Sequence, residues 1–180
     1  MPNTSALERA APERETDMAL EQEMTMYRFL QNYGEGLLGG LDADRAFVAS
    51  TEGGHHPAWI LGHLALVGNQ GAQLLGGTPA IDIEAWKPLF GIGSQPTARA
   101  ESYPEWAELV GAWRQTREVA SSSAAAIDEE KLNEPNPIER RRDTLPTLGN
   151  FVGFIFTSHE AVHLGQLSAW RRGQGLPPLF

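Results

Sequence analysis

The sequence predicts an all-α protein, a four-helix bundle with long connections between the helices. In four separate stretches, apolar residues recur at the three- and four-residue spacing of a helix face. No stretch alternates polar and apolar residues for long enough to build a sheet. Four amphipathic helices that each need to bury one face pack into a bundle. The length of 180 residues favours one domain over residues 16–180, preceded by a flexible polar segment over residues 1–15.

The first two helices are expected over residues 17–38 and 57–75. Thr16 or Asp17 can cap the first helix. Its expected buried stripe is Met26, Phe29, Leu30, Tyr33 and Leu37. The second helix has Pro57 in its first turn and stops at the Gly76-Gly77 pair. Its stripe consists of Ile60, His63, Val67, Gln70 and Leu74.

The third and fourth helices have clearer start signals. Ser102 to Glu105 has the pattern of a capping box, with Pro104 in the first turn, and the apolar period then continues to Ile127. The fourth helix is expected from about Thr147 to Arg171 or Arg172. Its stripe consists of Leu148, Val152, Ile155, His159, Val162, Leu167 and Trp170. Connections of about 15 or more residues permit topologies beyond simple up-and-down packing. The connection at 78–101 is long enough to suggest a functional role.

Composition excludes several classes of function. The formal net charge of −9 argues against nucleic-acid binding and against adhesion to anionic membranes. The chain has no cysteine, so a disulfide, a thiolate metal site and a cysteine nucleophile are all excluded. The polar N-terminus lacks the apolar segment of a secretory signal, and no stretch is long enough to span a membrane. A cytoplasmic protein with a small-molecule substrate is therefore expected.

Three of the five histidines lie on the predicted core-facing stripes. His159 and His163 are four residues apart, which on a helix places their side chains about 40° apart and one turn apart along the axis. His63 on the second helix could supply a third nitrogen from across the bundle. Three imidazoles with open positions describe a catalytic metal site. The alternative is three buried, hydrogen-bonded core histidines. His55 and His56 lie too far along the helix to share the ion and are expected as loop or capping residues near the mouth of the site.

Two further polar residues lie beside the histidine pair. Glu160 completes the literal HExxH pattern of zinc peptidases, in which the glutamate is the general base. Only seventeen residues follow His163, and a third downstream ligand is missing, which disfavours a peptidase. Glu160 is thus a weak catalytic candidate, and the alternative is that it is an exposed helix residue without a catalytic role. Gln166, one turn after His163, is a candidate for orienting an imidazole by a hydrogen bond.

The stretches GGHHPAWILGHLA (53–65) and HEAVHLGQLSAWRR (159–172) resemble the DinB-like, damage-inducible superfamily. The resemblance extends from about Met18 to Phe180. It implies a four-helix bundle that holds a divalent metal, zinc or nickel, on His63, His159 and His163, and it often implies a homodimer. Members of this superfamily include thiol-dependent S-transferases that use bacillithiol, mycothiol or glutathione.

The leading functional hypothesis is a metal-dependent transferase that activates a low-molecular-weight thiol toward a small electrophile. The absence of cysteine agrees with an external thiol as cosubstrate. A metal-dependent hydrolase that uses metal-bound water requires the same three histidines, with Glu160 or a loop residue as proton shuttle. A non-enzymatic stress protein that only sequesters a metal or a ligand is the third possibility.

Overall fold

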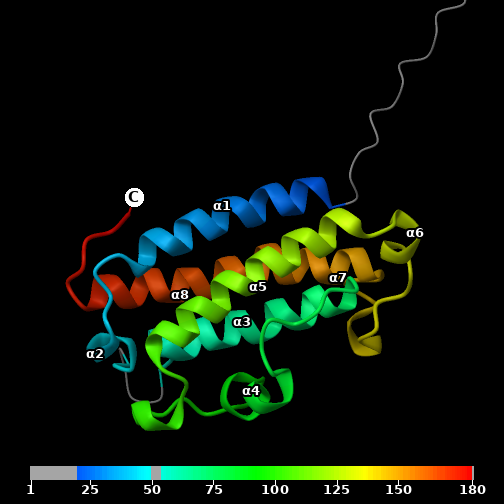
Figure 1. Ribbon diagram of the computed structural model, residues 1–180. Coiled ribbons are helices and arrows are strands. Elements are labelled where there is room, and N and C mark those ends of the chain that lie inside the picture. Colours follow the sequence, from blue (N-terminus) through cyan, green and yellow to red (C-terminus); the bar gives the residue numbers. More distant parts are fainter. Residues whose placement is uncertain (1–19, 50–53, 180) are drawn as a thin grey trace, which may run out of the picture.

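The computed structural model describes residues 20–49 and 54–179, and four long helical segments make up its body (Figure 1). These are α1 (Glu21–Leu38), α3 (Pro57–Leu74), α5 (Trp106–Ala126), and a last segment formed by α7 (Leu148–Phe154), η3 (Ile155–His159) and α8 (Glu160–Gly173). Short elements fill the connections: α2 (Ala43–Ala46), α4 (Ile83–Phe90), η1 (Ala100–Ser102), α6 (Glu129–Leu132) and η2 (Glu139–Arg141). The described residues contain no strand, only an isolated bridge between Pro135 and Thr147. The predicted all-α four-helix bundle is confirmed.

The bundle does not have an up-and-down topology. Helices α3 and α5 run in the same direction, while α1 and the α7–α8 segment run the opposite way (Figure 1). The connection from α3 to α5 must therefore return along the whole length of the bundle. Helix α4 lies in this connection, and the side chain of Asp82 caps it by accepting hydrogen bonds from the backbone of Glu84 and Ala85. The long connection expected at 78–101 is thus partly helical.

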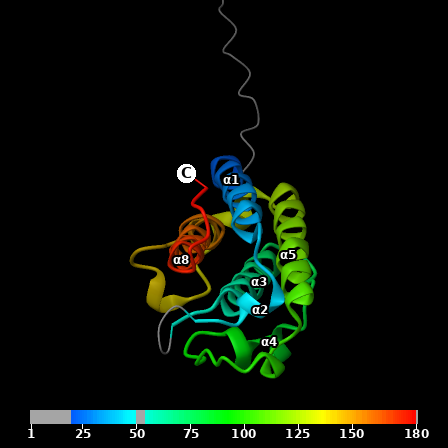
Figure 2. The same ribbon diagram turned by 90° about the vertical axis from the view of Figure 1, so that its left-hand side faces the viewer.

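Helix α3 is the central helix, buried on nearly every side by α4, α5 and α8 (Figure 2). Its glycines permit close packing: a Cβ built on Gly62 would lie 2.5 Å from Cζ of Phe90. Apolar side chains form two clusters along the bundle. One gathers around α3, α4 and the second half of α8, and the other gathers around α7 and the start of α1. None of the helices in the described part of the chain is both long and apolar enough to cross a membrane.

The buried face of α1 differs from the predicted stripe. Met26 and Phe29 are 51% and 54% exposed, so their assignment to the core was wrong. The buried residues are Met24, Tyr27, Leu30, Gln31, Gly34 and Leu37. The helix faces this way because Gly34 meets the ring of Trp113, where a Cβ would lie 2.6 Å from Cη2. Likewise Val162, expected on the stripe of the last helix, is 60% exposed. The proposed caps Thr16 and Asp17, and the segment 1–15, lie outside the described residues.

The capping boxes also differ from the prediction. Ser102 ends the short segment η1, and α5 begins at Trp106 without a side-chain cap from Glu105. The predicted capping box at Ser102 is therefore wrong. A capping box does form at the start of the last segment, where Thr147 and Asn150 bond each other's backbone N–H groups. That start agrees with the prediction.

Candidate metal centre

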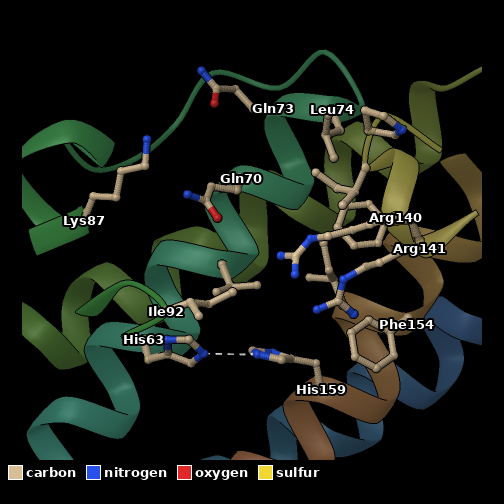
Figure 3. Close-up of a pocket in the computed structure, with 15 residues that line it drawn as sticks. His63, Gln70, Gln73, Leu74, Lys87, Ile92, Arg140, Arg141, Phe154 and His159 are labelled. Atoms are coloured by element: carbon tan, nitrogen blue, oxygen red, sulfur yellow. Dashed lines mark hydrogen bonds between the residues drawn. The ribbon is translucent and has the colours of Figure 1, made fainter. Parts of the chain in front are cut away.

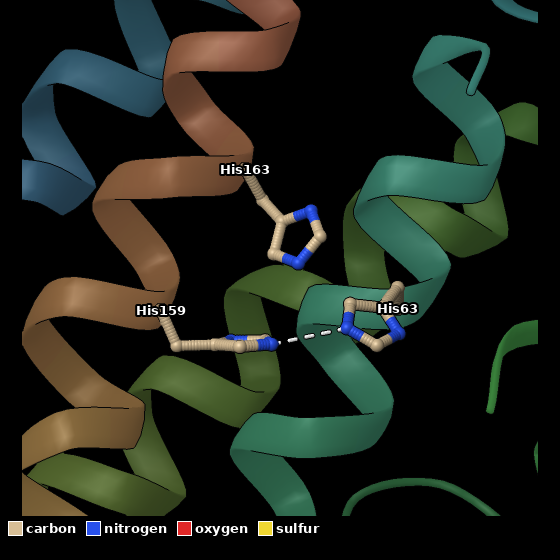
Figure 4. A group of neighbouring side chains, drawn as sticks. All are labelled: His63, His159 and His163. Atoms are coloured by element: carbon tan, nitrogen blue, oxygen red, sulfur yellow. Dashed lines mark hydrogen bonds between the residues drawn. The ribbon is translucent and has the colours of Figure 1, made fainter. Parts of the chain in front are cut away.

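The structure brings the three predicted histidines together at the interface between α3 and the last helical segment (Figure 4). His63 projects from α3, His159 is the last residue of η3, and His163 lies one turn later in α8. Nε2 of His63 is 3.1 Å from Nε2 of His159. One ring nitrogen from each of the three histidines lies within 4.8 Å of the other two. Such a group could hold one metal ion.

His63 is oriented from two sides. Its Nδ1–H donates a 2.6 Å hydrogen bond to the carbonyl oxygen of Phe90, the last residue of α4. The ring of Trp59, one turn earlier in α3, stacks on it with 4.8 Å between centroids and 9° between planes. With the proton on Nδ1, Nε2 carries a free lone pair that faces His159. The connection at 78–101, expected to be functional, thus supplies the group that sets the tautomer of His63.

A π-helical turn, Ile155–His159, leads into the histidine pair. Within it Thr157 Oγ1–H donates a 2.6 Å hydrogen bond to the carbonyl oxygen of Gly153. Short π turns inside α-helices occur frequently at functional sites. The sequence predicted one helix over this region without indicating the wide turn, because apolar periodicity cannot reveal a single π turn. His163 follows in regular α-helix and keeps the expected position one turn after His159.

Gln166 lies against the imidazole of His163. Its Oε1 accepts a hydrogen bond of 3.0 Å from His163 Nδ1, which leaves Nε2 of His163 free to face the other two rings. The same oxygen lies 3.4 Å from Nδ1 of His55, whose ring stacks on Trp59. His55 therefore lies at the edge of the site. His56 instead caps α3, because its Nδ1 accepts a hydrogen bond from the backbone N–H of Trp59.

Burial keeps all three imidazoles neutral. It is the main cause that lowers the pKa of His159 to about 3 and that of His163 to about 4, and it also lowers the pKa of His63. The neighbouring histidines lower the pKa of His159 and His163 further, since two positive charges this close would repel each other. Neutral imidazoles are the form that binds metal ions.

Glu160 does not belong to this group. Its carboxylate accepts a 3.1 Å hydrogen bond from the indole Nε1–H of Trp113, in the core beside α5. Only 3% of the residue is exposed, so the alternative of an exposed helix residue is wrong. Burial raises the pKa of Glu160 to about 7. Glu160 is not among the residues that line the neighbouring pocket, so its geometry does not suit the general base of an HExxH peptidase.

A pocket of about 750 Å³ opens beside His63 and His159 (Figure 3). Most of its wall is apolar and comes from α3 and the last helical segment. Its lining comprises His63, Val67, Gln70, Gln73, Leu74, Lys87, Ile92, Pro137, Ile138, Arg140, Arg141, Phe151, Phe154, Ile155 and His159. Arg140 and Arg141 could not be predicted as site residues, because a charged run after a proline-rich turn has no spacing that indicates a site.

The donor set fits a divalent ion. Two nitrogen lone pairs that face each other at 3.1 Å repel unless a proton or a cation lies between them. Phe90 and Gln166 hold the Nδ1–H groups of two imidazoles, which is the arrangement found around histidines that bind zinc and similar metals. The third histidine, His159, lies one turn before His163 and faces His63 across the interface between the helices. Nitrogen ligands of this kind suit zinc and nickel.

Comparisons with known proteins agree with this architecture. The family model described as the DinB superfamily matches residues 26–167. No curated protein sequence matches the chain. Among solved structures, YfiT from Bacillus subtilis, described as a probable metal-dependent hydrolase with an unusual four-helix bundle topology, superposes with a TM-score of 0.60. It is 13% identical, and the match covers 93% of this chain and 95% of YfiT, a likeness that shows the fold. Because the family model covers well over half of its length, the chain belongs to the DinB superfamily.

Proposed function

We propose that this protein is a divalent-metal-dependent S-transferase that joins a low-molecular-weight thiol to a small electrophile. The observation that carries the proposal is the convergence of three neutral imidazoles, from His63, His159 and His163, beside an apolar pocket. A divalent ion on such a donor set lowers the pKa of a thiol or water that binds it, so that an anionic nucleophile is available at neutral pH.

The lining of the pocket favours thiol transfer over hydrolysis. Among the described residues it includes no aspartate, glutamate, serine, threonine or tyrosine. Hydrolysis of an amide or an ester is usually assisted by a group that takes a proton from water and returns it to the leaving group. An ionised thiol needs no such base: its sulfur forms a bond to carbon, halide leaves, and the proton has already passed to solvent. The apolar wall limits the access of water to the reacting groups.

Hydrolysis is the second candidate, and one observation favours it. YfiT, which shares the fold along nearly its whole length, is described as a probable metal-dependent hydrolase. The same three histidines would serve this reaction. His55, at the edge of the site beside Gln166, would be the candidate for moving a proton in this reaction.

The test compares metal-free protein with protein reloaded with zinc or nickel. Each sample is incubated with 1-chloro-2,4-dinitrobenzene and bacillithiol, mycothiol or glutathione, and the thioether product is measured by its absorbance. We expect product only from the reloaded wild type and not from His159→Ala. A panel of small esters and amides is run in parallel. Metal-dependent hydrolysis without thioether formation would favour the second candidate, and tight metal binding without any turnover would refute both.

A further inference from the structure

The pocket beside the histidines has a positive side in an otherwise acidic protein. The chain carries 23 acidic and 14 basic residues, yet the lining of this pocket includes Lys87, Arg140 and Arg141 and none of the acidic residues among those the structure describes. In Figure 3 the guanidinium groups of Arg140 and Arg141 point into the pocket, on the same side as the ring of Phe154. The local charge is thus opposite to that of the whole molecule.

The two arginines have no carboxylate partner within residues 20–49 and 54–179. By contrast, Arg114 and Arg117 of α5 both pair with Glu35, at 2.7 and 2.8 Å. Lys87 is partly neutralised by Glu84 at 3.3 Å. Arg141 lies over the ring of Phe154, with 5.6 Å between its Cζ and the ring centroid.

The backbone that presents these arginines is well held. The buried side chain of Asn136 donates a 2.8 Å hydrogen bond to the carbonyl of Leu145 and accepts one of 2.8 Å from the backbone of Ile138. Arg142, next in the chain, donates from its Nε to the carbonyl of Asn136 at 2.7 Å. Arg142 therefore closes the turn, while its two predecessors face the pocket. An arginine pair on a fixed turn is pre-organised for a planar anion such as a carboxylate.

We propose that the pocket selects small organic acids: the carboxylate of the substrate pairs with Arg140 and Arg141 while its apolar body lies against Val67, Phe154 and Ile155. Its reacting end would then face His63 and His159. The chemistry at the reacting end of the substrate rests on the proposed function, but the recognition of the acid depends only on the two arginines. Arg140 and Arg141 are thereby assigned as the residues that determine specificity for substrate charge.

The test measures binding to metal-free protein, in which a carboxylate cannot ligate an ion. The probes are 4-phenylbutyrate and its uncharged isostere 4-phenylbutanamide, titrated at low ionic strength and followed by calorimetry. We expect the wild type to bind the acid at least about tenfold more tightly than the amide, as a charge-assisted pair requires. The double variant R140Q/R141Q should bind both equally. The control R28Q, which changes an exposed arginine of α1 that bonds only Thr25 among the described residues, should keep the preference.

Because Arg141 packs on Phe154, the single variant R140Q provides a version that retains this contact, and it should lower the preference by itself. Equal binding of acid and amide by the wild type, a preference that survives in R140Q/R141Q, or no binding of the acid would each overturn the inference. Failure of the proposed function looks different. An acid preference without metal-dependent turnover leaves this inference standing, whereas turnover that ignores the charge of the electrophile refutes this inference alone.

Discussion

Replacing Gly62 with alanine should destabilise the protein, although alanine is the better helix former. Gly62 lies in the middle of α3, and a Cβ there would lie 2.5 Å from Cζ of Phe90 and closer still to Cε1 and Cδ1. Phe90 is fully buried, so its ring has no open side to move into. The clash also bears on the candidate metal centre, because the carbonyl of Phe90 holds Nδ1 of His63.

The expected magnitude follows from two opposing terms. Alanine in place of glycine within a helix contributes about 1 kcal/mol of stability. Overpacking a close-packed core costs about 1–3 kcal/mol, and a rigid ring without space places Gly62→Ala near the upper end. The net loss should be about 2 kcal/mol by these terms. Gly111 in α5 is the matched control, because a Cβ there meets nothing within 4 Å, so Gly111→Ala should gain about 1 kcal/mol.

Urea unfolding followed by circular dichroism measures both variants, and the difference of about 3 kcal/mol between them isolates the clash. A second readout is zinc affinity, determined by competition with a chelator. It should fall about tenfold in Gly62→Ala, because the group that orients His63 is displaced, and it should not change in Gly111→Ala. If Gly62→Ala were as stable as Gly111→Ala, the packing of α4 on α3 described above would be refuted.

Three further predictions concern Gln166, His159 and Glu160. Gln166→Ala should weaken zinc binding about 10–100-fold in the chelator competition, since it frees the ring of His163; an unchanged affinity would contradict the role of Gln166. In metal-free protein, His159 has a pKa of about 3, below the 6.5 of an ordinary histidine. Below pH 6.5 the unfolded chain therefore binds a proton at His159 that the folded chain does not bind. The free energy of unfolding should fall as the pH falls from 6.5 toward 3. Urea titrations across this range should show a flatter profile for His159→Asn, and identical profiles would refute the assignment. Glu160 should change the stability in the opposite direction, because its pKa is raised from 4.5 to about 7. Its ionisation lowers the free energy of unfolding as the pH rises through this interval. Glu160→Gln should therefore be more stable than wild type at pH 8, by roughly 3 kcal/mol, and nearly equal to it at pH 4; equal stability at both values would contradict this.

Local sequence signals predicted the structure correctly where the conformation of a segment depends only on neighbouring residues. The helix start near Thr147, the stop at Gly76-Gly77 and the four-residue spacing of His159 and His163 depend on nearby residues alone, and the predictions from them agree with the structure. The buried side of α1 was predicted wrongly, because Gly34 faces Trp113 and that pairing joins segments far apart in the sequence.

In the candidate site, too, the features that depend on nearby residues could be predicted and those that depend on distant contacts could not. Its three histidines could be chosen from their positions on apolar stripes, and Gln166 from its place one turn after His163. The carbonyl of Phe90 could not be predicted, because every residue has a carbonyl and only the path of α4 brings this one to His63. Glu160 was misjudged for a related reason. A rule based on average exposure cannot anticipate that the indole N–H of Trp113, from another helix, meets its carboxylate in the core.

The π-helical turn Ile155–His159 also divides the last segment between the two apolar clusters. Leu148 and Val152 before it pack into one cluster, and Leu164 and Leu167 after it pack into the other. Each residue of an α-helix advances the chain by about 100° around the axis. One extra residue in a regular helix would therefore rotate α8 against α7 by roughly that angle. A π turn holds one residue more than an α turn and absorbs this residue without the rotation. The apolar residues on both sides of the turn thus keep their faces toward the two clusters, while His159 and His163 keep theirs toward His63.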